Sequence, residues 1–283
     1  MMQKLFIFIQ HLTPQHLLSR LIGYIAECKI GWIKNSLINY FIKKYDVNMS
    51  ESAIQDPRQF EHFNDFFTRA LKSEARPLSL SKQSVLCPVD GTISQLGAID
   101  QGRIFQAKGY SFNLVDLLGG EISRAKPFIN GQFANIYLSP KNYHRVHMPV
   151  TGTLKEMVYI PGKLFSVNKT TAEHIPQLFA RNERVVCIFD TPFGSMAIIL
   201  VGAMIVASIE TVWAGLITPP KRQLKSVRYD NKSPITIKQG AELGHFKLGS
   251  TVIVLFGIEK IKWCEQLNAD TSVIMGQKMN QYP

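Results

Sequence analysis

Cysteine is scarce in this chain and widely scattered. The four cysteines, Cys28, Cys87, Cys187 and Cys264, form no Cys-x-x-Cys pair and have no zinc-ligand spacing. Long apolar runs are also missing, because the longest, residues 196–207, has twelve residues and a membrane-spanning helix needs about 18 to 20. These absences predict reduced thiols in a reducing compartment, no metal site and no membrane-spanning helix.

Signals for export, import and repetition are missing as well. The first 45 residues contain one arginine, Arg20, and no clear small-residue cleavage site, so we expect neither a transit peptide nor a secretory signal. There is no repeat at a fixed period and no low-complexity tract. The segment Gly194-Ser195-Met196 does not complete the Gly-x-Ser-x-Gly elbow of the common serine hydrolases.

Acidic residues are outnumbered by basic ones. The chain of 283 residues has 32 Lys and Arg against 21 Asp and Glu, which gives a formal charge of +11. This excess favours a polyanionic partner, such as nucleic acid, an acidic membrane or a phosphorylated substrate. The alternative is basicity without a particular partner. Because 46% of the residues are hydrophobic, the chain can bury a sizeable core.

Residues 1–45 have the pattern of apolar helices. Thr13 and Pro14 suit the cap and the first position of a helix, and Lys43 and Lys44 suit the last turn of another. Apolar residues recur at helical spacing in both segments: Leu17, Leu18, Leu21, Ile22, Ile25, and then Ile30, Ile33, Leu37, Tyr40, Phe41. Such amphipathic helices are typical of a membrane interface. Packing on the protein's own core is the alternative.

The remaining residues, 46–283, predict a catalytic domain that is mainly β. A third helix is expected to begin at Asp56-Pro57, end at Arg76-Pro77 and place its phenylalanines in the core. A short helix is expected at 114–118. Apolar runs between glycine, proline and asparagine predict strands at 133–138, 154–160, 185–189, 198–206 and 251–256. The predicted fold class is α+β, with N-terminal amphipathic helices before a mainly antiparallel domain.

Three short motifs contain candidate catalytic side chains. Asp90 precedes Gly91, a pair that also signals a hairpin turn. His144 and His147 lie between Pro140 and Pro149, and so belong to a turn or an irregular strand, although a metal pair or ordinary polar residues are alternatives. Ser250 follows Gly249 at the start of an apolar run, where the alternative is a simple turn before a strand.

Aspartate, histidine and serine are the components of a charge-relay triad. A serine hydroxyl needs a base, and imidazole is suited to that role near neutral pH. A serine after glycine can also attack the carbonyl of the preceding residue, because glycine lacks a Cβ that would hinder the required bend. The motifs alone do not establish that the three side chains meet.

The chain resembles the bacterial, pyruvoyl-dependent phosphatidylserine decarboxylases over nearly its whole length. At Phe112-Asn113-Leu114 it departs from the expected Tyr-Ser-Leu, which affects only a side-chain contact near the substrate. The main motifs of the resemblance are Phe66-Phe67-Thr68-Arg69, Pro88-Val89-Asp90-Gly91, Tyr143-His144-Arg145-Val146-His147, Leu164-Phe165-Ser166-Val167-Asn168, Arg181-Asn182-Glu183-Arg184-Val185 and Leu248-Gly249-Ser250-Thr251.

The resemblance implies a self-processing enzyme. Asp90, His147 and Ser250 would form the charge relay that cuts the chain between Gly249 and Ser250. The products would be a large β chain, 1–249, and a small α chain, 250–283. Ser250 would become the covalent pyruvoyl cofactor and the Schiff-base centre, and His144 would transfer a proton during decarboxylation. No metal or diffusible cofactor is implied.

The implied reaction converts phosphatidylserine to phosphatidylethanolamine in phospholipid biosynthesis. The expected partners are the lipid, an anionic membrane surface and the cleaved fragments themselves, with a homodimer of these as a further expectation. The expected location is the cytoplasmic face of the inner cell membrane, as a peripheral protein. The alternatives are an ordinary serine hydrolase, which would remain one chain, and a non-catalytic membrane adaptor. Nucleic-acid binding has no zinc module or RNA-binding motif to support it.

Overall fold

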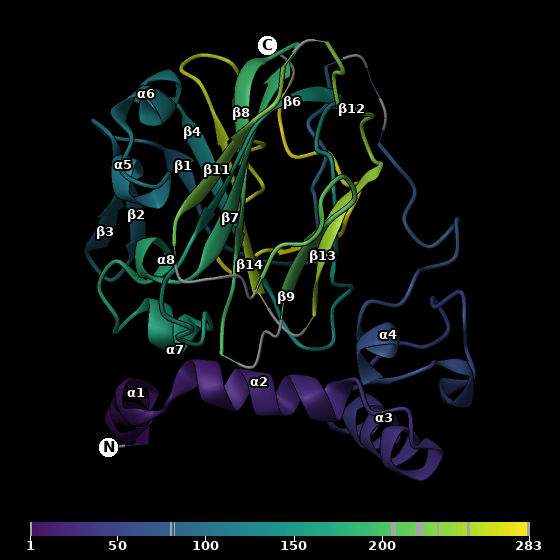
Figure 1. The fold of residues 1–283 in the computed structure, drawn as a ribbon. Helices are drawn as coiled ribbons and strands as arrows, with labels where there is room; N and C mark the ends of the chain where they lie inside the picture. The colour runs from purple at the N-terminus through teal and green to yellow at the C-terminus, as the bar shows by residue number, and fades with distance from the viewer. Residues whose placement is uncertain are drawn as a thin grey trace.

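The computed structural model describes residues 2–79, 81, 83–204, 208–218, 223–230, 232–247 and 250–281. Three helices come first in the chain and lie along one end of the molecule (Figure 1). The described helices are α1 Met2–Leu12, α2 Gln15–Ala26, α3 Gly31–Tyr45, α4 Phe63–Phe67, α5 Leu114–Leu117, α6 Ile122–Ala125, α7 Lys169–Ala172 and α8 Leu178–Arg181, with 3-10 turns η1 Pro57–Gln59 and η2 Lys126–Phe128.

Two larger sheets and a hairpin form the rest of the described fold. The largest sheet has the strand order β11-β6-β7-β8-β14-β4-β1-β15, with β12 also pairing β6; the second has the order β10-β9-β13-β5; β2 and β3 form the hairpin. The strands are β1 Gly91–Ala98, β2 Arg103–Ala107, β3 Tyr110–Asn113, β4 Gln132–Leu138, β5 Arg145–His147, β6 Gly152–Ile160, β7 Arg184–Thr191, β8 Gly194–Val201, β9 Ser208–Thr211, β10 Gly215–Leu216, β11 Lys225–Arg228, β12 Thr236–Ile237, β13 Glu242–Lys247, β14 Ser250–Phe256 and β15 Ser272–Val273.

The pairs between the named strands are antiparallel, which confirms the predicted fold class. Each of the five predicted strands lies within or overlaps an observed one. The fourth, predicted for 198–206, ends at Val201, and residues 205–207 lie outside the described part of the chain. No described helix is long and apolar enough to cross a membrane.

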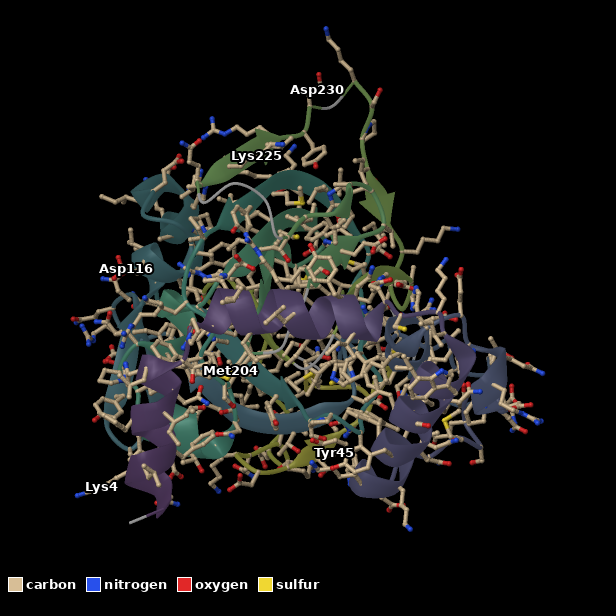
Figure 2. All side chains as sticks on the ribbon, turned by 60° about the horizontal axis from the view of Figure 1, so that its bottom comes forward. Lys4, Tyr45, Asp116, Met204, Lys225 and Asp230 are labelled. Atoms are coloured by element: carbon tan, nitrogen blue, oxygen red, sulfur yellow. The ribbon has the colours of Figure 1, made fainter. Side chains whose placement is uncertain are left out.

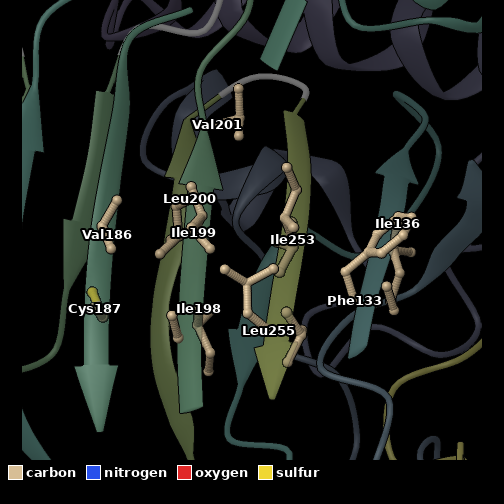
Figure 3. Packing of buried hydrophobic residues seen from close by; sticks show 14 of the residues in the cluster. Phe133, Ile136, Val186, Cys187, Ile198, Ile199, Leu200, Val201, Ile253 and Leu255 are labelled. Atoms are coloured by element: carbon tan, nitrogen blue, oxygen red, sulfur yellow. The ribbon is translucent and has the colours of Figure 1, made fainter. Parts of the chain in front are cut away.

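The middle of the large sheet is buried on both faces. In β14 all seven residues are buried, and its neighbours β8 and β4 are buried along most of their length. Their β-branched residues suit a pleated, covered surface, and Ile253 faces Ile199 on one side and Asn135 on the other. Figure 3 shows Ile198, Ile253 and their neighbours filling this part of the core.

The second sheet packs into the same core. Ile209 of β9 and Phe246 of β13 belong to one buried cluster with the residues of the large sheet. β5, which carries the paired histidine motif, is held at the edge of this second sheet by β13. The two sheets therefore place the histidine motif and the start of β14 on neighbouring elements of one domain.

Helix α2 has its apolar residues on the outside. Leu17 and Leu21 are exposed, whereas Gln15 and Ser19 are buried against the domain. The Gln15 side chain accepts a hydrogen bond from the Leu164 backbone N at 2.7 Å and donates one to the Gln10 carbonyl at 2.8 Å. Polar contacts thus help to hold the helix to the domain, Ile22 and Ala26 pack into a second buried cluster, and Leu17 and Leu21 remain exposed.

Helix α3 has one face in a core of its own. Ile38 and Phe41 pack with the phenylalanines of the following segment in a second buried cluster, which confirms core packing for Phe60, Phe63, Phe66 and Phe67. Tyr40, which the spacing placed on the same face as Phe41, is exposed.

The predicted third helix is wrong as a single element. Asp56 does cap a turn, and its carboxylate accepts from the Arg58 backbone N at 3.0 Å. The turn η1 ends at Gln59, however, and α4 covers only Phe63–Phe67. Two short elements are enough to bury the phenylalanines. A continuous helix is not needed to bury side chains at these positions.

Candidate active site

Ser250 is the first residue of β14 and is completely buried. It is paired in register with Leu138 of β4. Its Oγ atom has no hydrogen-bond partner among the described residues. A buried hydroxyl without a partner costs free energy, so it marks a site where a reaction or a ligand would use the group. Gly249, the other residue of the predicted cleavage site, lies outside the described residues.

His144 is the second buried group without a full set of partners. Its Nδ1 donates to the backbone O of Asn142 at 2.8 Å, since a carbonyl can only accept. Its Nε2 is then the unprotonated nitrogen, and it has no partner in the described structure. The ring of Phe67 packs against it at 4.0 Å between centroids. Burial lowers the pKa of His144 to about 3, so the imidazole is neutral at physiological pH.

His147 has both ring nitrogens occupied. Nδ1 donates to the Gly240 carbonyl at 2.8 Å, and Nε2 accepts from the Tyr143 hydroxyl at 3.0 Å. Burial lowers the pKa of His147, while the Gly240 hydrogen bond and the negative charges of Glu242 and Asp90 act in the opposite direction. The tautomer with a basic Nε2 is therefore set by a backbone carbonyl.

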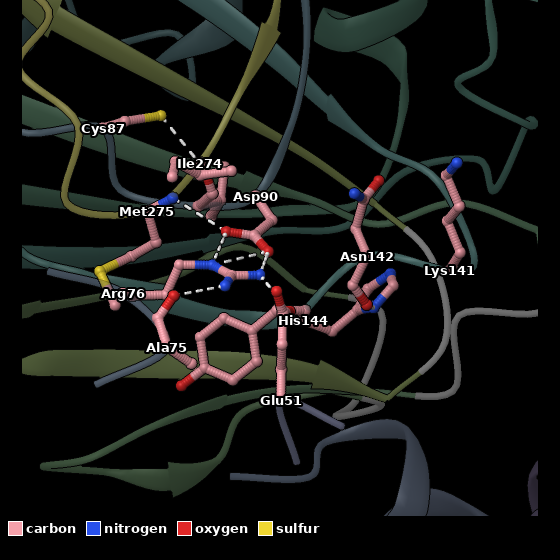
Figure 4. A network of polar contacts seen from close by, with 12 residues as sticks. Glu51, Ala75, Arg76, Cys87, Asp90, Lys141, Asn142, His144, Ile274 and Met275 are labelled. Atoms are coloured by element: carbon pink, nitrogen blue, oxygen red, sulfur yellow. Dashed lines mark hydrogen bonds and ion pairs between the residues drawn. The ribbon is translucent and has the colours of Figure 1, made fainter. Parts of the chain in front are cut away.

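Asp90 is buried and bound by Arg76 (Figure 4). The Arg76 Nε lies 2.9 and 3.1 Å from the two carboxylate oxygens, and Nη2 lies 2.5 Å from Oδ2. The Met275 backbone N also donates to Oδ1 at 2.9 Å. Arg76 reaches Glu51 as well, at 2.8 Å. The hydrogen bond to Asp90 raises the pKa of Arg76 and is the largest influence on it.

Two glycines fix the backbone around these side chains. A Cβ on Gly91 would lie 2.4 Å from the Tyr137 carbonyl, so glycine lets β1 approach β4 directly after Asp90. The motif Asp90-Gly91 therefore opens a strand and does not form the hairpin turn that was the alternative. Gly240 has a φ of +77°, a conformation that side chains rarely adopt, and its carbonyl receives His147.

No hydrogen bond among the described residues joins the predicted site residues to one another. Asp90 influences His147 through its charge, but the two do not hydrogen-bond; Arg76 holds the carboxylate and Gly240 holds the imidazole. Ser250 bonds to neither histidine. Among the described residues, no group of three or more His, Cys, Asp or Glu is arranged to hold a metal ion.

The sequence did not point to four of these contacts. Arg76 and Tyr143 lie in recognisable motifs, but no sequence pattern predicts that Arg76 binds Asp90 or that Tyr143 binds His147. The Gly240 carbonyl left no signal, because a backbone acceptor can belong to any residue. Phe67 stood in a motif with the other phenylalanines, and only the folded chain places its ring on His144.

A buried serine whose hydroxyl has no partner in the described structure lies at the start of a central strand, in one domain with the buried, neutral His144 and the partly buried His147. This arrangement fits the class of enzymes that process their own chain. A family model described as phosphatidylserine decarboxylase matches residues 63–281, and a second, described as PSD, matches residues 5–46. The chain therefore belongs to the phosphatidylserine decarboxylase family, the pyruvoyl-dependent decarboxylases of phospholipid biosynthesis, which confirms the resemblance of the sequence.

Curated relatives agree over the whole chain. The phosphatidylserine decarboxylase proenzyme of Ectopseudomonas mendocina is 66% identical over 279 residues, 98% of each chain. That of Pseudomonas putida is 63% identical over 281 residues, covering 99% of this chain and 98% of its own. That of Pseudomonas fluorescens is 62% identical over 283 residues, 99% of each chain.

Proposed function

We propose that this chain decarboxylates phosphatidylserine to phosphatidylethanolamine at a membrane surface, with a pyruvoyl group that it makes from Ser250. Membership of the family supports the reaction. The single observation that supports the site is the buried Ser250 hydroxyl without a partner. In forming the covalent group, the hydroxyl oxygen would leave with Gly249 and a ketone on Cα would replace the Ser250 amine, so the group would be formed from the residue itself.

The proposed cut is an internal acyl transfer. The Ser250 Oγ attacks the Gly249 carbonyl, the peptide C–N bond breaks, and an ester joins the two residues. Loss of the Ser250 α-proton expels Gly249 as a carboxylate and leaves dehydroalanine. Its enamine tautomerises and is hydrolysed by water, which releases ammonia and leaves the pyruvoyl group. The products are the chains 1–249 and 250–283.

In this proposal His147 takes the proton from Ser250, and Asp90 supports the imidazolium that results. The Nδ1–H tautomer, which leaves Nε2 as the acceptor of the Tyr143 hydroxyl, and the nearby charge of Asp90 favour these roles. The Gly240 carbonyl already orients the ring of His147. Asp90 therefore acts through its negative charge, and would hydrogen-bond the ring only by replacing that carbonyl during the cut. His144, with a basic Nε2 in a dry site, moves a proton at the substrate α-carbon.

The pyruvoyl group supplies an electron-withdrawing carbonyl that takes up the electron pair left behind as CO2 departs. The side chains around Ser250 bind the head group, exclude water and hold the proton that replaces CO2. Burial of Ser250 and His144 supports this arrangement, because a dry site strengthens every electrostatic contact within it.

We further propose that α1–α3 rest in the membrane interface, on the cytoplasmic face of the inner membrane. The outward apolar side of α2 supports this, because Gln15 and Ser19 are buried against the domain while Leu17 and Leu21 are exposed. Exposed apolar residues continue along all three helices: Leu5, Phe8, Leu12, Leu17, Leu21, Tyr24, Ile25, Ile30 and Trp32. Figure 2 views this end of the molecule, with α2 crossing in front of the domain.

The test is the mass of the purified chain under denaturing conditions. Wild type is expected to give two fragments, the smaller with a pyruvoyl end, and decarboxylase activity. Ser250→Ala is expected to give one uncut, inactive chain, because no hydroxyl can attack Gly249. Ser195→Ala, a serine in β8 outside the site, should cut and turn over normally. Two fragments from Ser250→Ala would refute the proposal.

A further inference from the structure

A small polar cavity lies at the turn that precedes His144 in the chain. Its volume is about 220 Å³, and it is bordered by the segment 46–51, the residues after α4 and the turn at 141–143. Arg69, Asp90, Asn142 and Tyr143 are among its lining residues. Asn142 is also the residue whose carbonyl holds His144, so the cavity adjoins the candidate active site.

Arg69 contributes a guanidinium group that lacks normal partners. The residue is only 5% exposed, and its Nε has no hydrogen-bond partner in the described structure. The one hydrogen bond that it forms with the described residues is long, 3.4 Å from Nη2 to the Lys141 carbonyl, and its guanidinium lies 5.3 Å from the centre of the Phe66 ring. Burial lowers the pKa of Arg69 to about 10, so the group stays charged at neutral pH.

Two of the three carboxylates that line the cavity are already bound by Arg76, and the third, Asp46, forms no ion pair with Arg69 in the described structure. Asp90 gives both oxygens to Arg76, and Glu51 also binds Arg76. Arg69 forms no ion pair within the described residues. Arg184 provides a comparison: it is equally buried and has no carboxylate, yet it donates to three backbone carbonyls, those of Leu117, Asn182 and Asp116. A buried guanidinium without such partners is costly and calls for an anion.

We propose that Arg69 binds the phosphodiester group of the substrate head group, an inference that rests on the proposed function. A guanidinium suits phosphate because its N–H groups can pair with two oxygens at once. The head group also carries a carboxylate, but tight binding of the group that leaves as CO2 would stabilise the ground state and slow the reaction. Phe67, two residues before Arg69, packs on His144. Phosphate at Arg69 would therefore direct the serine part of the head group toward that histidine.

The kinetic test compares Arg69→Gln and Arg69→Lys with wild type, all self-cleaved. The KM for phosphatidylserine should rise at least tenfold in Arg69→Gln. It should rise less in Arg69→Lys, which keeps the positive charge but not the paired N–H donors of a guanidinium. The extent of cleavage should be unchanged. Arg103→Gln, which removes an exposed arginine on β2, is the matched control and should leave KM unchanged. A wild-type KM in Arg69→Gln would overturn the proposal.

A binding test works without turnover. In uncut Ser250→Ala, glycerophosphoethanolamine carries the phosphodiester without a carboxylate, and free serine carries the carboxylate without phosphate. Calorimetry should show binding of the first that weakens at least tenfold when Arg69→Gln is added, and no comparable effect on the second. An effect on serine alone, or on neither, would overturn the proposal. Inorganic phosphate is a third probe, and should bind more weakly than the diester if the head group is recognised as a whole.

Stability separates this role from a structural one. Because Arg69 lacks a compensating partner in the unliganded chain, Arg69→Gln should not lower the thermal midpoint of Ser250→Ala. A variant that fails to fold would overturn the proposal. A failure of this proposal can be distinguished from a failure of the proposed function. A wild type that binds glycerophosphoethanolamine through Arg69 but neither cuts nor decarboxylates would reject the proposed function alone.

Discussion

His144 and His147 are separated by two residues, yet the fold gives their rings different chemistry. His147 is enclosed by the Gly240 carbonyl and the Tyr143 hydroxyl. His144 keeps a basic nitrogen that faces no partner in the described structure. The difference arises because successive turn and strand residues project to different sides, which gives one histidine to chain cutting and the other to turnover in our proposal.

Replacing His144 should separate the two reactions. We expect His144→Ala to cut normally but to lose about 10² to 10⁴ in decarboxylation rate, the usual contribution of a placed proton-transfer group. Mass spectrometry of the fragments and release of CO2 measure the two steps. His174→Gln, a histidine on the segment after α7, is the control and should leave both unchanged. Normal turnover by His144→Ala would remove this residue from the site.

Acid should destabilise the uncut precursor through the same histidine. The folded pKa of His144 is about 3 and the unfolded value about 6.5, so between these values the unfolded chain binds more protons. Stability is therefore present above pH 6.5 and is lost as the pH falls, at roughly 1 kcal/mol per pH unit. Urea unfolding of Ser250→Ala from pH 7 to 4 measures it. In Ser250→Ala/His144→Gln the slope should flatten by about that amount, with a remainder from His147; an unchanged slope would contradict the burial of a neutral His144.

Sequence patterns identified side chains well and their partners poorly. Ser250, Asp90 and both histidines lie in short motifs, and the burial of Ser250, Asp90 and His144 follows from the apolar runs around them. The bidentate contact between Arg76 and Asp90 joins residues 14 positions apart, and the contact between His147 and Gly240 joins residues 93 apart. Such pairings depend on how the strands assemble, which periodicity does not report.

At the scale of secondary structure, α2 shows that an amphipathic pattern does not tell which face is covered. The spacing of its leucines predicted the helix, and packing against the domain was a reasonable alternative. Gln10 and Gln15 decide the orientation, because they satisfy backbone groups of the segment 164–166. The third helix failed for a related reason: its phenylalanines recur at helical spacing, but burial alone does not require a continuous helix.

Removing the outward leucines of α1 and α2 should weaken membrane binding without unfolding the domain. For Leu12→Gln, Leu17→Gln and Leu21→Gln combined, we expect at least a tenfold loss of binding to vesicles with anionic lipid, since a fully buried leucine contributes about 1.5–3 kcal/mol. Co-sedimentation measures it. Ile122→Gln alters an equally exposed residue on α6, at the other end of the molecule in Figure 1, and should bind normally. Undiminished binding by the triple variant would leave these helices without a membrane role.

At the scale of the whole molecule, the segment 250–281 forms backbone hydrogen bonds with several separate parts of the domain. β14 lies between β8 and β4. Near the end of the segment, Met279 donates a backbone hydrogen bond to Val85, and Cys87 donates one to Gln277. Cutting the chain before β14 would therefore remove one covalent bond and few of the contacts that hold the segment in place.

The two fragments should stay together after cleavage. We expect them to co-elute in native size-exclusion chromatography and to separate only in denaturant, because β14 is buried along its whole length. Ile253→Ala, which removes side-chain volume at the centre of that strand, should lower the free energy of unfolding by about 2–5 kcal/mol. Release of the small fragment from wild type in native buffer would contradict this picture.

The pairing of β14 with both neighbours also determines where a reactive carbonyl would be held. A diffusible cofactor is positioned by a pocket and can leave it, whereas a ketone at the end of this strand is positioned by hydrogen bonds along seven residues. A shift of one residue in that pairing would turn position 250 toward the opposite face of the sheet. The accuracy of catalysis in this protein would then rest on the alignment of neighbouring strands.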